Sequence, residues 1–246
     1  MAMSAMERAE AAEHAMSAAL DRIAVKSVIY TSGERDPREP LPRPADQGFY
    51  LMGADPRLAP MPLRPTLFDF FKLRFGPSQH MLQSARLAAK NGVGEKIVLA
   101  CLLHDIAITG FIRSDHGYWA AQLLEPYVDP EVSWAIRYHQ ALRFYPDDSV
   151  GYEYPALYEK LFGPDYRPEP YVEQAYREAR AHKWYMSARL ITVNDLYSFD
   201  ATVRVELEEF TDVVGRHFRQ PAEGLGFDGS PSAHMWRTII APTRYL

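Results

Sequence analysis

The sequence predicts an all-α protein, and three observations support this. From Leu67 onward apolar residues recur with helical spacing, and helix start and stop signals frame several of these segments. Sustained alternation of apolar and polar residues, the pattern typical of a β-strand, is not found along the chain. Hydrophobic residues make up 47% of the 246 residues and aromatic residues 13%, which is enough for a packed core. We therefore expect one helical domain with extra segments at its ends.

Residues 1–66 are expected to form a helix and a Pro-rich N-terminal arm. Residues 3–24 are rich in Ala and Glu, which favours a surface helix by intrinsic propensity. Prolines are dense from Asp36 to Pro65 and favour an extended chain, because proline lacks a backbone donor. The apolar run FYLM at residues 49–52 indicates that this arm packs against the domain.

The next four segments predict helices. SQHMLQSARLAAKNG (78–92) begins with a Ser cap and ends with Asn-Gly. EKIVLACLLHDIA (95–107) is apolar on nearly all sides, so this helix should be buried. HGYWAAQLLEPYV (116–128) and PEVSWAIRYHQAL (130–142) follow, the second with proline in its first turn.

The rest of the chain is less regular. Residues 144–190 form a Tyr-rich insert, which is either simple packing or a lid over a pocket. One long helix is expected from about Pro170 through Ser198, and another over VRVELEEFTDVVGRHF (203–218). A C-terminal tail, residues 218–246, is expected to pack on the domain.

Composition excludes several classes of function. The 27 basic and 32 acidic residues give a formal net charge of −5, which argues against nonspecific binding to nucleic acid or to an anionic membrane. Cys101 is the only cysteine, so no intrachain disulfide can form, and it lies in an apolar run typical of a core. No transmembrane stretch is present, and the acidic N-terminus is unlike a signal peptide. We expect a cytoplasmic protein.

Six side chains of the kinds that bind metal ions occur in order along these helices. Imidazole and carboxylate donors suit iron, manganese, zinc or magnesium better than a soft thiolate site does. In the adjacent His-Asp pair, the carboxylate could bridge two cations while its neighbour binds one of them. The set is large enough for two metal shells and predicts a dinuclear metalloenzyme. We refer to these residues as the six candidate ligands: His80, His104, Asp105, His116, His139 and Asp195.

An isolated His-Asp dipeptide occurs by chance, and a single buried histidine is usually structural. The ordered set of six is what favours metal binding. The remaining histidines have no such partners and are expected to be surface or capping residues: His14, His182, His217 and His234.

The pattern resembles the HD-domain superfamily of metal-dependent phosphohydrolases and oxygenases, whose fold is an all-helical bundle. Within this superfamily, the sequence around the candidate ligands looks most like the diiron oxygenase branch. HMLQSA from His80, the string VLACLLHD, His116 followed by A-x-x-L, and I-x-x-H ending at His139 carry this likeness. The resemblance covers about residues 67–200 and implies an HD domain over residues 67–217 that includes the insert.

The resemblance implies two iron ions, as Fe2+ and Fe3+, which use O2 to oxidise a small hydroxylated substrate. One ion would be bound by His80, His104, Asp105 and Asp195. The other would be bound by His116, His139 and Asp105, which bridges the pair and is thus catalytic. The same donors would accept Mn2+, Zn2+ or Mg2+, and the alternative function is a metal-dependent phosphohydrolase. A third reading is an HD fold that serves as a binding or assembly module, in which the Pro-rich arm could mediate a homodimer.

Some positions depart from the superfamily pattern. Many relatives have Gly and then Lys or His after the HD-x string, whereas this chain has Ala107 and Ile108, which counts against phosphohydrolysis and phosphonate recognition. Arg143 stands four residues after His139, where the phosphonate-cleaving branch has a substrate-binding lysine, so we name it as a second catalytic candidate that could hold an anionic group. The alternative is a structural ion pair with Asp147 or Asp148.

Overall fold

The computed structural model describes residues 59–75, 78–107, 115–196, 198, 200–227, 230 and 232–240. The expected helix at 3–24, nearly all of the Pro-rich arm, and Ile108 lie outside the described residues. Within these described residues, the helical elements are α2 (Leu67–Leu73), α3 (Gln79–Lys90), α4 (Glu95–Leu103), α6 (His116–Leu124), α7 (Pro130–Leu142), η1 (Asp148–Val150), α8 (Ala156–Phe162), α9 (Pro170–Ala181), α10 (Tyr185–Leu196), η2 (Leu207–Phe210), α11 (Thr211–His217) and α12 (Ala233–Ile240).

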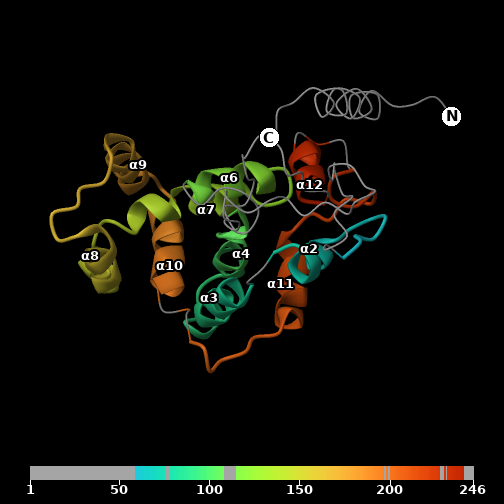
Figure 1. The fold of residues 1–246 in the computed structure, drawn as a ribbon, viewed down its shortest axis with the longest axis horizontal. Helices are drawn as coiled ribbons and strands as arrows, with labels where there is room; N and C mark the ends of the chain where they lie inside the picture. Colours follow the sequence, from blue (N-terminus) through green and yellow to red (C-terminus); the bar gives the residue numbers. More distant parts are fainter. Residues whose placement is uncertain are drawn as a thin grey trace, which may run out of the picture.

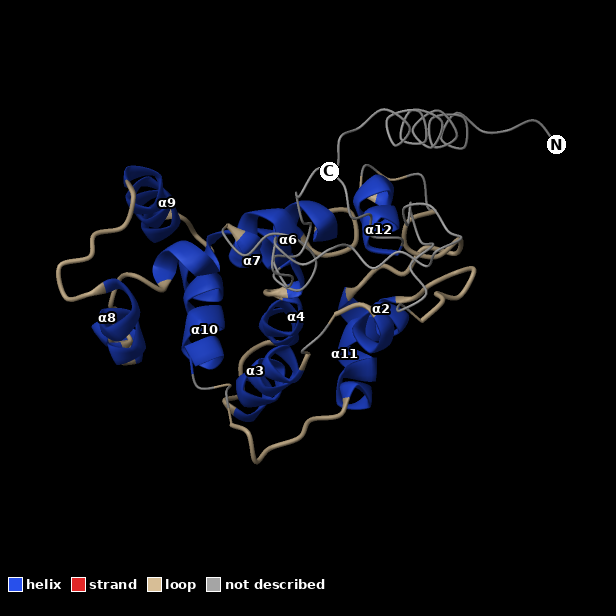
Figure 2. Ribbon diagram, in the orientation of Figure 1, coloured by secondary structure: helices blue, strands red, loops and turns tan. Residues whose placement is uncertain are grey.

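The fold is all-α, as the sequence predicts. Across the described ranges no strand is formed, and the only bridge of β type joins Asp147 to Tyr152 (Figure 2). Helix α4 lies near the centre, in contact with α3, α7, α10 and α11. Helices α8 and α9 lie at one end of the molecule, and α2, α11 and α12 lie at the other (Figure 1). In the part of the chain that is described, no helix combines the length and apolar character needed to cross a membrane.

The predicted signals mark the start of α7 and the end of α3, whereas the Ser cap predicted for α3 is only partly confirmed. Asp129 caps α7 by accepting a hydrogen bond from the backbone of Glu131, and Pro130 occupies the first turn. Asn91 is the C-cap of α3, and Gly92 follows with φ +71°, a left-handed conformation that glycine adopts without strain. Ser78 lies at the N-cap position of α3, but its side chain makes no capping hydrogen bond.

The core forms around α4, whose residues from Leu99 to Leu103 are fully buried, as the apolar text predicts. Cys101 is among them. At the far end of the core, Trp236 of α12 packs edge-to-face on Phe70 with ring centroids 4.7 Å apart. Its indole N–H donates to the carbonyl of Leu123, so α12 is joined to α6 through the core.

Two helix predictions were wrong. The long helix expected from Pro170 through Ser198 is divided into α9 and α10, because His182 leaves the helical conformation (φ −90°, ψ 147°). Its ring stacks on Trp134 of α7 with centroids 4.1 Å apart, and its Nδ1 accepts a hydrogen bond from the backbone of Trp184. The helix expected over 203–218 begins at residue 207 instead, where Glu206 and Glu209 form a capping box.

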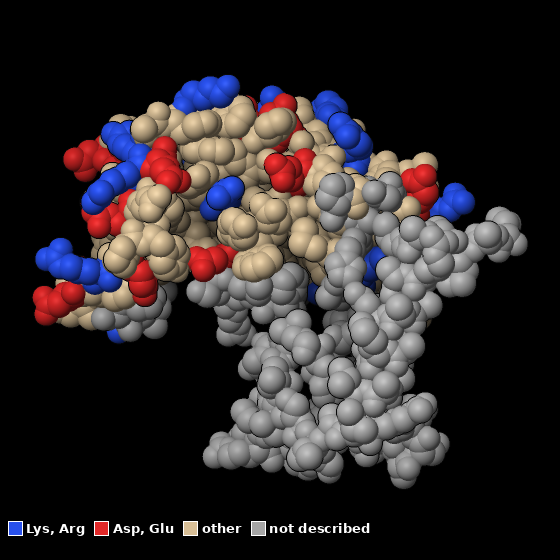
Figure 3. Space-filling model, turned by 90° about the horizontal axis from the view of Figure 1, so that it is seen from above, with Lys and Arg blue, Asp and Glu red and all other residues tan. Residues whose placement is uncertain are grey.

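The face in Figure 3 carries acidic and basic side chains interspersed with neutral ones. Such mixing produces no extended field of one sign on the described part of that face.

Candidate metal centre

The six candidate ligands come from five places in the fold. His80 is in the first turn of α3, and His104 and Asp105 directly follow α4. His116 is the first residue of α6, His139 lies near the end of α7, and Asp195 lies near the end of α10. Because α4 contacts α3, α7 and α10 in the core, these distant parts of the sequence meet at one point.

The structure brings all six together as two groups that share one member. In each group, the potential ligand atoms lie within 4.8 Å of one another. The first cluster is His80, His104, Asp105 and Asp195, and the second cluster is Asp105, His116 and His139. Asp105 belongs to both clusters, which is the position a bridging carboxylate would hold.

Individual distances show how tightly the atoms converge. In the first cluster, Asp195 Oδ1 lies 2.7 Å from His80 Nε2 and 3.6 Å from His104 Nε2. In the second cluster, Asp105 Oδ1 lies 3.1 Å from His116 Nε2 and 3.8 Å from His139 Nε2. Five of the six residues are buried and His80 is half-buried, so these polar atoms are withdrawn from solvent.

Three of the imidazole rings are held by main-chain carbonyls. The Nδ1 atom of His104 lies 2.7 Å from the Cys101 carbonyl, and that of His80 lies 3.0 Å from the Ser198 carbonyl. The Nδ1 atom of His139 lies 2.6 Å from the Ile136 carbonyl. A carbonyl only accepts, so each Nδ1 must carry a hydrogen, and in the neutral ring Nε2 then presents its lone pair to the centre. This is how proteins fix a histidine that binds metal through Nε2.

The donor set fits a pair of metal ions. Among the described atoms, His104 Nε2, Asp105 Oδ1 and Asp195 Oδ1 are fully buried and make no hydrogen bond. Buried polar atoms are nearly always satisfied, and each one left unpaired costs about 1–3 kcal/mol. Cations between these atoms would satisfy them all. Four imidazoles and two carboxylates form a hard-to-borderline set that suits iron, manganese or zinc.

The surroundings of His139 and Asp195 favour the protonation states that bind metal ions. Burial lowers the pKa of His139 to about 4, against the opposing effect of Asp105, so its imidazole is neutral at pH 7. Burial alone would raise the pKa of Asp195. The Arg143 guanidinium and the nearby imidazoles nevertheless hold that pKa well below its usual range.

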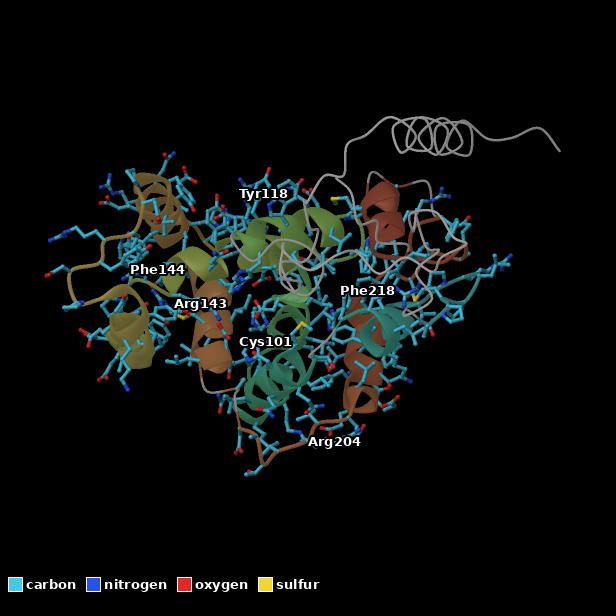
Figure 4. The ribbon with its side chains drawn as sticks, in the orientation of Figure 1. Cys101, Tyr118, Arg143, Phe144, Arg204 and Phe218 are labelled. Carbon is cyan, nitrogen blue, oxygen red and sulfur yellow. The ribbon has the colours of Figure 1, made fainter. Side chains whose placement is uncertain are left out.

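Arg143 lies at the C-terminal end of α7 and points to α10 (Figure 4). Its Nε donates to Asp195 Oδ2 over 2.8 Å, and its Nη2 contacts the same oxygen. The other oxygen of Asp195 faces the imidazoles, so the carboxylate joins the guanidinium to the metal centre. The alternative prediction was an ion pair between Arg143 and Asp147 or Asp148. Neither ion pair is found among the described contacts of Arg143.

Asp147 instead belongs to a buried network that the sequence reasoning missed. Its carboxylate accepts a hydrogen bond from Tyr185 and lies 3.5 Å from Nε of Arg189, which is fully buried in α10. Arg189 Nη1 donates to the Leu142 carbonyl over 2.9 Å. The network therefore ties the end of α7 to α10. Arg189 is the one cation in the text of α10 (YMSARLITVNDL), and that signal could have revealed it.

The Tyr-rich insert contributes to the surroundings of the centre. Tyr152 donates its hydroxyl to the Arg143 carbonyl over 3.1 Å. Burial raises the pKa of Tyr158, and the charges of Arg143 and Asp195 also act on its phenol. Other tyrosines pack among themselves, such as Tyr145 on Tyr176 with centroids 3.9 Å apart.

Gln83, on α3, acts outside the metal centre. Its amide donates to the carbonyls of Asp200 and Val203 and accepts from the backbone of Asp200. These bonds hold the segment that follows Ser198, the residue whose carbonyl accepts the hydrogen bond from His80. Gln83 thus supports the ring of His80 through the main chain.

A cavity of about 540 Å³ lies between α6, α7 and α9. Aromatic side chains such as Tyr118 and Phe144 line it, together with Arg137 and Asp115. None of the six candidate ligands is among the residues that line this cavity.

Comparisons with known proteins agree with this arrangement. Residues 78–183 match the family model for the HD domain, a range that includes all six candidate ligands except Asp195. The chain is 32% identical over 81 residues to a [1-hydroxy-2-(trimethylamino)ethyl]phosphonate dioxygenase (glycine-betaine-forming) from Leisingera caerulea. That match spans 28% of this chain and 40% of the relative. On this match and on the clustered donors, the chain contains an HD domain with a His/Asp metal site.

Proposed function

We propose that this protein is a diiron oxygenase, which uses O2 to oxidise a small hydroxylated organic molecule. The observation that carries the proposal is the shared position of Asp105 in two clusters of metal-binding atoms, because it provides for two ions side by side. Support for oxygenase chemistry comes from the dioxygenase relative.

Two iron ions, as Fe2+ and Fe3+, would supply the redox chemistry when bound. The chain's own residues would hold these ions and shield them from water. Main-chain carbonyls fix the rings of His80, His104 and His139, so their lone pairs already face the centre before a metal enters. Burial of the donors excludes water and strengthens each electrostatic contact.

Arg143 is the residue that we assign to the substrate. Its contacts with Asp195 use Nε and Nη2, which leaves other guanidinium donors for an acidic group of the substrate. Such a group would lie beside the centre, with Tyr158 near it. The substrate class is therefore a small molecule that carries both a hydroxyl and an acidic group.

Metal content tests the proposal directly. The protein is reconstituted anaerobically with Fe2+, its iron is quantified, and the sample is partly oxidised for low-temperature EPR. We expect two irons per chain and a coupled mixed-valent signal. His139→Ala should remove about one equivalent while far-UV circular dichroism is unchanged. His217→Ala is the matched control, since His217 pairs with Glu95 at 2.9 Å far from the cluster and should retain both irons.

The outcomes separate the alternatives. Fewer than two metals in the wild-type protein would overturn the dinuclear assignment. Two metals without the mixed-valent signal, together with phosphatase activity with Mn2+ or Mg2+, would identify a phosphohydrolase instead.

A further inference from the structure

Helices α6 and α7 meet at a glycine that directly follows a candidate ligand. A Cβ atom added to Gly117 would lie 2.7 Å from the carbonyl oxygen of Ile136 and 3.2 Å from that of Arg137. It would also lie 3.1 Å from Cε1 of His139. Side chains essentially never approach backbone oxygen to 2.7 Å, and a carbonyl inside a helix cannot move alone, so only glycine fits here.

The carbonyl of Ile136 has a second task. It accepts the hydrogen bond from Nδ1 of His139 over 2.6 Å, the bond that turns Nε2 of that ring to the centre. Gly117 therefore packs against both the ring of His139 and the atom that orients it. On the other side, Gly117 is covalently joined to His116, whose Nε2 lies 3.1 Å from Nε2 of His139.

We propose that Gly117 is a positioning residue for the second cluster: its missing side chain lets α6 approach α7 closely enough for His116 and His139 to share one metal ion. This inference rests on the proposed dinuclear function. Any larger residue must shift α6 outward, which moves His116, or shift the Ile136 carbonyl, which turns His139. Either movement disrupts the second cluster and leaves the atoms of His80, His104 and Asp195 in place.

The variant Gly117→Ala tests the proposal through metal content. Wild-type protein and variant are reconstituted with Fe2+ alone, and iron per chain is measured beside far-UV circular dichroism. We expect the variant to keep its helical signal and to lose about one of two irons. Gly215→Ala is the matched control, because Gly215 also lies in a helix but an added Cβ would meet nothing within 4 Å. The control should keep both irons.

A second variant covers the case in which Gly117→Ala does not fold. The double variant Gly117→Ala/His139→Ala lacks the ring that Cβ meets at 3.1 Å. A folded double variant with the same iron content as His139→Ala supports action through the second cluster. A double variant that also fails to fold would overturn the proposal, because the glycine would then serve helix packing alone.

Two full irons in Gly117→Ala, with two in the wild-type protein, would refute the positioning role and leave the proposed function intact. Fewer than two irons in the wild-type protein would instead refute the proposed function itself.

Discussion

Replacement of Arg189 by methionine should destabilise the protein severely. Methionine preserves much of the aliphatic volume of arginine, so the change mainly removes the guanidinium. Arg189 is fully buried, and its Nη1 donates to the Leu142 carbonyl. Its Nε donates to the Tyr185 hydroxyl over 3.1 Å and lies 3.5 Å from an oxygen of Asp147.

The size of the effect follows from these contacts. Without the guanidinium, the buried carboxylate of Asp147 loses its only described cation, and the Leu142 carbonyl loses a donor. Removal of one partner from a buried ion pair costs about 3–5 kcal/mol, because an uncompensated charge remains. Relief from desolvation of Arg189, one of whose nitrogens makes no described hydrogen bond, offsets part of this cost. We expect a net loss of about 3 kcal/mol.

Urea unfolding followed by circular dichroism measures this free energy. Arg177→Met is the matched control, because Arg177 pairs with Glu173 on the exposed face of α9. Exposed pairs of this kind contribute about 0.3–0.5 kcal/mol, so the control should unfold almost as the wild type does. A loss below about 1 kcal/mol for Arg189→Met would show that burial of the guanidinium costs as much as its contacts return.

Three further predictions concern other parts of the structure. Arg143→Ala should raise KM and also lower the iron content, because Asp195 loses its guanidinium partner. Arg143→Lys should retain the iron and still raise KM. An unchanged KM in both variants would show that Arg143 does not bind substrate. Trp236→Ala should cost about 3–5 kcal/mol in urea unfolding, because Trp236 is fully buried, whereas Trp119→Ala, at an exposed site, should cost about 1 kcal/mol. Equal losses would contradict the assigned core. Asp115 has φ 54° just before α6, a backbone conformation that Asn adopts easily and β-branched residues do not. Asp115→Val should therefore cost about 1–3 kcal/mol in the same assay, and Asp115→Asn almost nothing. A tolerated valine would show that the turn relaxes freely.

The sequence predicted those features that are encoded by local pattern. The continuous apolar sequence of residues 95–107 predicted a buried central helix, and proline in a first turn marked the start of α7 at Pro130. The clustering of the six candidate ligands was also predictable, because each stands near the end or start of a helix and helices of one domain converge on one core. Their role as ligands stays a prediction until metal is measured.

Features that depend on contacts across the fold were not predictable. The helix breaks at His182, whose ring stacks on Trp134 of α7. The local sequence around His182 does not reveal this contact. Arg143 has two acidic neighbours in sequence, yet it pairs with Asp195 because α10 returns beside α7. Glycine has a low helix propensity, so the sequence gives no reason for Gly117 in α6. Only its close approach to the neighbouring helix α7 reveals its importance.

The carbonyl contacts of the imidazole rings have a consequence for how this protein could diversify. Every residue offers the same carbonyl, so the orientation of His80, His104 and His139 does not depend on which side chains stand at the acceptor positions. Substitutions there can alter volume and polarity around the centre without rotating a ligand. Such a centre can acquire new substrates through changes in the surrounding side chains while its metal chemistry is inherited unchanged.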